Sequence, residues 1–299
     1  DERFALLAEA FTDAGLLLRI APGATLERPL HLVHRGQGPS QARLLIEAGA
    51  GSRARIIEQF GTSGSAGTVA NLLAELALGD GASLEHLRLH EQDASAAHVE
   101  TIRVSQGRDS RYRQQFCVLG GRVVRSDLRP VLGGSGATDE IEGLFMVDGI
   151  RQADLYTLIE HRAPRTTTVE TVRGVASDRG RGAFNGRIVV HEGATKSDSR
   201  QSSRNLILTP LAEINARPQL EILTDDVKCS HGATVGSLDP QQLFYLLSRG
   251  RDPATARGLL TFAFGEDLVG RIAWPEVRRH VEELVVGKLP DRDIIREFV

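Results

Sequence analysis

The 299-residue sequence predicts a β-solenoid followed by a small α-helical domain. A glycine turn recurs along most of the chain, strand-like segments lie between its copies, and helix-start signals gather near the end. The turn reads Gly-Ala-Thr or a close relative, with copies beginning at Gly23, Gly51, Gly81, Gly136, Gly193 and Gly232. Degenerate copies at residues 107–110 and 163–166 bring most intervals to 26–30 residues.

The segments between these turns alternate apolar and polar residues, which is typical of half-buried strands. Clear examples are residues 54–60, 84–89, 99–104 and 186–190. Two or three such strands per 26–30 residues predict one coil of a solenoid, and coils must stack to bury their inner faces. The alternative is a large β-sandwich, but its turns recur every 8–12 residues without a longer period.

The two ends of the chain are predicted to be helical. Residues 2–11 place Phe4, Leu7, Ala8 and Phe11 on one helical face, and the first strand follows at residues 16–20. We therefore divide the chain into a helical segment at 1–15, a β core at 16–237 and a helical domain at 238–299.

The C-terminal helices have clear start signals. Asp239-Pro240 and Asp252-Pro253 each combine an N-cap residue with proline at the first helical position. A third helical pattern covers residues 266–286, with a break expected at Trp274-Pro275. The apolar stripes of these helices fit either packing against one another or docking of a partner.

Composition narrows the class of protein. A net charge of −3 gives no reason to expect nucleic acid or an anionic membrane as a partner, and residues 259–264, among the longest apolar runs, are too short to span a bilayer. Two cysteines make no disulfide framework, which favours a cytoplasmic setting. The sequence starts at Asp1 and its only methionine is Met146, so we expect a trimmed chain. A transit peptide in a missing N-terminal piece would place the protein in a plastid.

Candidate chemistry is concentrated in Cys229-Ser-His231. On a strand the thiol and the imidazole would project from the same face, as a start for a soft or borderline metal. Lys228 would favour the thiolate, and Glu221, Asp225 and Asp226 offer oxygen ligands. Zinc and iron take about four ligands, so this is either half of a site or an ordinary strand end.

The other candidates are weaker. No P-loop is present, and residues 180–186 only approach a dinucleotide pattern, so they are interpreted as a tight turn. Cys117 fits a buried small hydrophobic residue. Most remaining histidines are interpreted as surface or inter-strand residues: His31, His34, His86, His90, His98 and His161.

Several long motifs carry a family resemblance. They are Pro218-Gln-Leu-Glu-Ile222, residues 225–236, and residues 243–246 with 248–250; residues 184–190, 194–201 and 205–208 match in order upstream. The chain resembles the SufB/SufD family of iron–sulfur cluster assembly proteins, strongly over about 140–270 and more weakly before. It is most similar to SufD-like members, because it reads Lys-Cys-Ser-His at 228–231 and has Ala216-Arg-Pro where SufB-like sequences carry a cysteine.

The resemblance implies a right-handed parallel β-helix flanked by helices, with residues 1–15 as a remnant of an N-terminal helical segment. It implies a non-catalytic scaffold that pairs with a SufB-like subunit and shares a transient iron–sulfur cluster with it. His231 would be the metal ligand, facing a cysteine of that partner, with Cys229 close by and Asp225, Asp226 and Lys228 in support.

The resemblance also implies a partner for the helical domain. A SufC-like ATPase would dock there and carry out ATP hydrolysis, so no ATP site is expected in this chain. The docking residues would be Leu243, Phe244, Tyr245, Arg249 and Gly250.

Two rival functions stay open from the residues alone. The first is a β-solenoid enzyme acting on polysaccharide, with Glu170, Arg173, Asp178 and Arg179 in a flanking groove. The second is a structural homodimer without cluster chemistry, joined through the exposed strands at one end of the solenoid.

Overall fold

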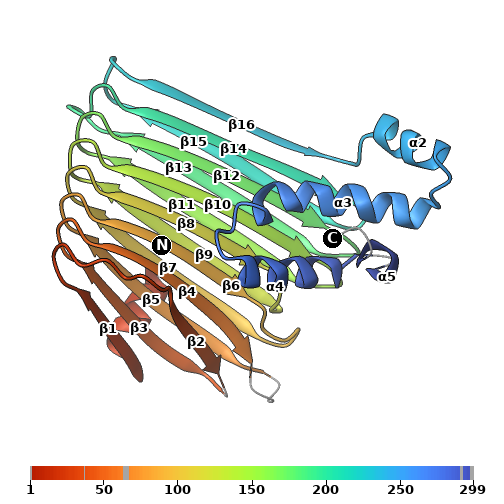
Figure 1. The fold of residues 1–299 in the computed structure, drawn as a ribbon, viewed down its shortest axis with the longest axis horizontal. Helices are drawn as coiled ribbons and strands as arrows, with labels where there is room; N and C mark the ends of the chain where they lie inside the picture. The colour runs from red at the N-terminus through yellow and green to blue at the C-terminus, as the bar shows by residue number, and fades with distance from the viewer. Residues whose placement is uncertain (1, 37, 63–66, 290–291, 297–299) are drawn as a thin grey trace.

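Two parallel sheets of eight strands each make up most of the molecule (Figure 1). The computed structural model describes residues 2–36, 38–62, 67–289 and 292–296. Odd-numbered strands form sheet A and even-numbered strands form sheet B, in sequence order across each sheet. The strands are β1 Ala14–Ile20, β2 Leu30–Gly36, β3 Ser40–Ala48, β4 Arg53–Thr62, β5 Val69–Leu78, β6 Ser83–His90, β7 Ala97–Gln106, β8 Arg111–Val118, β9 Val123–Leu132, β10 Thr138–Val147, β11 Gln152–His161, β12 Thr167–Ala176, β13 Arg181–Val190, β14 Asp198–Ile207, β15 Glu213–Ile222 and β16 Lys228–Gly236.

This topology confirms the predicted parallel β-solenoid and excludes the sandwich. Each coil adds one strand to each sheet, so Leu84 of β6 pairs with Tyr112 of β8, 28 residues later. A parallel pair cannot be joined by a tight hairpin, and here the crossover connection is the strand of the opposite sheet with its two turns.

In all but one case the predicted glycine turns lie between an odd-numbered strand and the even-numbered strand that follows it. The glycines at 23, 51, 81, 136 and 193 have φ between 67° and 82°, which glycine adopts at little cost. Asp109 and Arg165 take the same left-handed conformation at the two degenerate copies. The copy at Gly232 is wrong as a turn, because residues 232–234 lie inside β16 and pair with residues 202–204 of β14.

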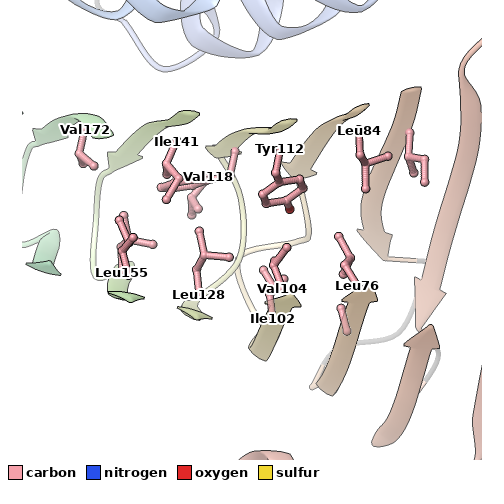
Figure 2. Close-up of a cluster of buried hydrophobic side chains, with 14 of the residues drawn as sticks. Leu76, Leu84, Ile102, Val104, Tyr112, Val118, Leu128, Ile141, Leu155 and Val172 are labelled. Carbon is pink, nitrogen blue, oxygen red and sulfur yellow. The ribbon is translucent and has the colours of Figure 1, made fainter. Parts of the chain in front are cut away.

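The interior between the sheets is the main core. Inward residues of sheet A, such as Ile102 and Leu128, face inward residues of sheet B, such as Leu84 and Ile141 (Figure 2). Each is fully buried, and burying such a side chain stabilises the fold by about 1.5–3 kcal/mol. Stacking of equivalent positions from coil to coil makes this core continuous.

The helices after residue 252 lie on the outer face of sheet B (Figure 1). Leu87, Leu144 and Val175 on that face pack with Val269 and Val285 in a second apolar cluster. Sheet B is therefore apolar on both faces where the helices cover it. The helices are α1 Arg3–Ala10, α2 Pro240–Ser248, α3 Pro253–Val269, α4 Pro275–Val286 and α5 Arg292–Ile295. None in the described part of the chain is long and apolar enough to cross a membrane.

Two details of the predicted helices are wrong. The buried face of α1 consists of Ala5 and Ala8 against Leu73, while Phe4 and Phe11 are exposed. Small residues let the helix backbone approach the sheet closely, so the larger side chains point away. In the C-terminal part, residues 266–269 finish α3 and do not begin a third helix.

Candidate functional site

The Cys229-Ser-His231 element lies on β16, the last strand of sheet B. In the described residues, β16 pairs only with β14, and β15, the last strand of sheet A, pairs only with β13. Figure 1 shows β16 along one edge of the stack, next to the connection that leads into α2. The candidate residues therefore occupy the final coil, whose backbone edge is open for pairing.

Cys229 and His231 share one face of β16, as predicted. They continue the inward rows of sheet B, because Cys229 pairs with Ser199 and His231 with Gln201, both buried. Cys229 packs against the main core, whereas His231 is exposed at the mouth of the solenoid. The chain presents one thiol and one imidazole side by side where the coils end.

The flanking charged residues do not join this pair. Lys228 is exposed and, as a neighbour on the strand, points to the opposite face from Cys229. Partial burial, together with the nearby Asp198 carboxylate, raises the pKa of Cys229, so the expected lowering by Lys228 is not found. Asp225 and Asp226 are exposed in the turn before β16. Within the described residues, a group of three or more metal-ligand side chains occurs only elsewhere, around His90.

A row of polar side chains leads from His231 into the solenoid. Gln201 of β14 lies beneath it in the register, and Glu170 of β12 lies beneath Gln201. Gln201 Nε2 donates to Glu170 Oε2 at 2.6 Å. Glu170 Oε1 and Gln201 Oε1 have no hydrogen-bond partner within the described residues. Burial raises the pKa of Glu170 to about 7. Over the last three strands of sheet B this inward row therefore carries Glu170, Gln201 and His231, after Ile141 on β10.

The predicted docking residues lie together on α2 and the turn after it. This helix has no buried residue and stands away from the sheets (Figure 1). Phe244 is 71% exposed and Tyr245 56% exposed, and the Arg249 guanidinium lies 5.2 Å from the Tyr245 ring centre. Gly250, with φ of 80°, ends the element. In contrast to α3 and α4, α2 leaves its largest apolar side chains without intramolecular cover.

The residues of the polysaccharide alternative do not line a common groove. Glu170 faces the interior, while Arg173 lies on the opposite face of β12 and binds Asp267 of α3 at 2.7 Å. Both are nearly inaccessible to solvent. A carboxylate and a guanidinium separated by the sheet cannot act on one substrate.

Two further predictions concern buried side chains. Cys117 lies in the cluster beneath the helices as predicted, and burial with the nearby Glu142 raises its pKa to about 12. His161 is held by Thr166 at 2.7 Å and Thr168 at 3.1 Å in a structural role.

A buried polar cluster was missed by the sequence interpretation. His86, His90 and His98 are at most 2% exposed and lie inside the solenoid with Arg88 and Glu100. The available signal was the spacing of residues 86, 88 and 90, which places three polar side chains on one face of a strand.

The comparisons with known proteins agree with this architecture. Residues 31–264 match the family model described as SUF system FeS cluster assembly, SufBD core domain. The chain is 30% identical to the iron–sulfur cluster assembly protein SufD of Escherichia coli (strain K12), with 97% of this chain and 70% of that protein covered. It is 28% identical to a SufBD family protein of Synechocystis (95% and 66% covered) and 28% identical to Protein ABCI7, chloroplastic, of Arabidopsis thaliana (92% and 60% covered).

The chain thus spans 60–70% of the length of these relatives. The family match covers the solenoid from β2 onward and continues into α3. The chain belongs to the SufBD family of the SUF system and has a role in iron–sulfur cluster assembly.

Proposed function

We propose that this chain is a non-catalytic scaffold subunit that supplies His231, with Cys229 beside it, to a cluster or sulfur-handling site completed by a SufB-like partner. The observation that carries the proposal is the position of these side chains on an end strand with one free edge. Two ligands are too few for iron or zinc, which take about four. A partner strand at this edge would satisfy the free backbone groups and bring the missing ligands.

The chemistry of the pair suits this role. A thiol and an imidazole are soft and borderline ligands that bind iron, zinc and copper. Partial exposure keeps His231 accessible, and the raised pKa of Cys229 keeps its thiol protonated until a metal displaces the proton. His231 is therefore the primary ligand in our proposal, and Cys229 assists.

The test is anaerobic reconstitution with a SufB-like and a SufC-like partner. The variant His231→Ala is expected to form the complex but to lose most of the iron and acid-labile sulfide bound per complex. His31→Ala, an exposed histidine on β2 at the other end of the stack, is the matched control. Undiminished cluster formation by His231→Ala would show that its proposed role is wrong.

The second part of the proposal is that α2 docks the SufC-like ATPase. Aromatic side chains exposed on a short helix are typical anchors of protein interfaces, and Phe244 is the most exposed large hydrophobic residue of the described chain. Phe244→Asp is expected to abolish ATPase binding in size-exclusion chromatography while leaving the circular dichroism of the solenoid unchanged. Gln242→Asp, an exposed change on the same helix, is the control. Retained binding by Phe244→Asp would count against docking at α2.

A further inference from the structure

A polar cage lies inside the N-terminal half of the solenoid, far from Cys229 and His231. Four strands separate β6 from β16 in sheet B, so the two places are about 24 Å apart at the usual strand spacing. The cage side chains come from β4 and β6 of sheet B and β7 of sheet A, and all are at most 2% exposed. We name as the cage Glu58, His86, Arg88, His90, His98 and Glu100.

The cage holds two buried carboxylates and one guanidinium. Arg88 donates to Glu100 at 2.6 Å and also binds Glu58, so one guanidinium serves two carboxylates. A cation bound beside Glu100 would be attracted to its carboxylate.

His90 has unused ligand capacity. Neither of its ring nitrogens makes a hydrogen bond of good geometry, although the ring is completely buried, and Nε2 has a polar contact of 3.4 Å with Glu100 Oε1. The ring stacks on Phe60 at 4.6 Å between ring centres, which fixes its plane and directs Nε2 to within 3.4 Å of Glu100 Oε1. Buried polar groups are almost always satisfied, so this imidazole points to an occupant.

His98 and Glu100 complete the geometry. His98 Nε2 lies 3.0 Å from Glu100 Oε2, and one ligand atom from each of His90, His98 and Glu100 lies within 4.8 Å of the others. Metal–ligand bonds of about 2.0–2.2 Å allow ligand atoms about 3–4 Å apart. The ligand atoms that lie farthest apart would need to approach by about 0.8–1.8 Å to enclose an ion.

The neighbours of the three ligands can serve as supports. His98 Nδ1 lies 3.1 Å from Gln92 Nε2, and Gln92 Oε1 has no partner. Rotation of that amide would let Oε1 accept a hydrogen bond from Nδ1–H, which leaves the Nε2 lone pair available for a metal. Ser126 donates to Glu100 Oε1 at 2.7 Å, and together with Arg88 it orients the carboxylate.

We propose that His90, His98 and Glu100 form a second, buried site for one divalent transition-metal ion of the Zn²⁺ or Fe²⁺ class. Two imidazoles and one carboxylate are a donor set that such ions prefer over Mg²⁺ or Ca²⁺. A cavity of about 330 Å³, lined in part by His34, Phe60 and His98, reaches the cage and provides an entry route. The site is independent of the ligand pair on β16.

The test uses the full chain in a Cys229→Ser/His231→Ala background, so that metal bound at β16 does not contribute. After chelator treatment, titration with Co²⁺ as a spectroscopic probe is expected to show visible d–d absorption that saturates at one equivalent. Zn²⁺ should displace the Co²⁺ and raise the thermal midpoint of unfolding. His90→Gln and His98→Gln, each in the same background, should weaken binding about tenfold or more, while His31→Ala should not.

Three results would overturn the proposal. The first is the absence of Co²⁺ absorption, and the second is metal binding that survives both glutamine variants. The third is a thermal midpoint of unfolding that Zn²⁺ does not change, as expected if the cage binds a proton and no metal. If either variant fails to fold, X-ray absorption of the Zn²⁺-loaded background chain decides. Two imidazole ligands and carboxylate oxygen support the site, and a shell without imidazole refutes it.

Discussion

The buried carboxyl of Glu170 should make the free energy of unfolding depend on pH. It is 1% exposed, Gln201 donates a hydrogen bond to its Oε2, and burial raises its pKa from 4.5 to about 7. A carboxyl with a raised pKa in the folded state is protonated there over a pH range in which the unfolded chain has already lost the proton. Its contribution to stability is therefore lost as the pH rises from about 4.5 to about 7. At 1.36 kcal/mol per pKa unit, the loss is about 3 kcal/mol.

Glu170→Gln removes the ionisation and keeps the shape of the side chain. We expect the free energy of unfolding of the variant, relative to wild type, to change little at pH 4.5 and to be higher by about 3 kcal/mol at pH 8. Urea denaturation followed by tryptophan fluorescence and circular dichroism at both pH values measures the difference. Glu192→Gln, an exposed glutamate, is the control and should show none of this pH dependence. A stability difference that is the same at pH 4.5 and pH 8 would refute the reasoning.

Three further changes probe the packing. Leu144→Ala should destabilise the fold by about 2–5 kcal/mol in urea denaturation, because it leaves a cavity between sheet B and α3; a loss below 1 kcal/mol would mean that the helices do not rest on this residue. Gly186→Ala should cost about 1–3 kcal/mol in the same assay, because a Cβ there meets the Gln201 side chain; wild-type stability would show that Gln201 has free space. Iodoacetamide at pH 8 should modify Cys229 and spare Cys117, whose pKa is raised to about 12, as mass spectrometry of the native protein would show; equal labelling would contradict the burial of Cys117.

The solenoid could be predicted because a backbone requirement that recurs in each coil leaves a repeated residue type in the sequence. A left-handed turn at a fixed point of each coil favours glycine, and the copies at Gly51 and Gly81 stand out in sequence for that reason. The same triplet at Gly232 misled the prediction, since glycine is also tolerated in an end strand. Only the pairing of β16 with β14 separates the two cases.

The orientation of α1 could not be predicted from its apolar residues. Helical periodicity favoured a face with Phe4 and Phe11, but the helix lies close to the sheet through Ala5 and Ala8. A helix that lies close to a sheet needs small side chains at the contact, whereas a prediction from apolar periodicity favours the face with the large side chains. The choice depends on the shape of the neighbouring surface, which the local sequence does not contain.

The two polar sites differ in how visible they are in sequence. Cys229 and His231 are two residues apart on one strand, so their common face follows from strand geometry alone. The cage requires His90 of β6 and Glu100 of β7 to meet across the interior from opposite sheets, which depends on how the chain turns between these consecutive strands. Alternation could have marked His86 and His90 as inward residues, but nothing local pairs them with β7.

The polarity of the last coils bears on how a partner would bind. On β10 one row of the inner face of sheet B carries Ile141, whereas on β12 and β14 the same row carries Glu170 and Gln201. An apolar row at an open end would expose hydrophobic surface to water whenever no partner is bound, whereas a polar row would not. A partner at β16 would gain backbone pairing and contacts to polar groups, rather than a large apolar interface. Such an end fits our proposal of a subunit that is stable before assembly and then contributes His231 to a shared metal site.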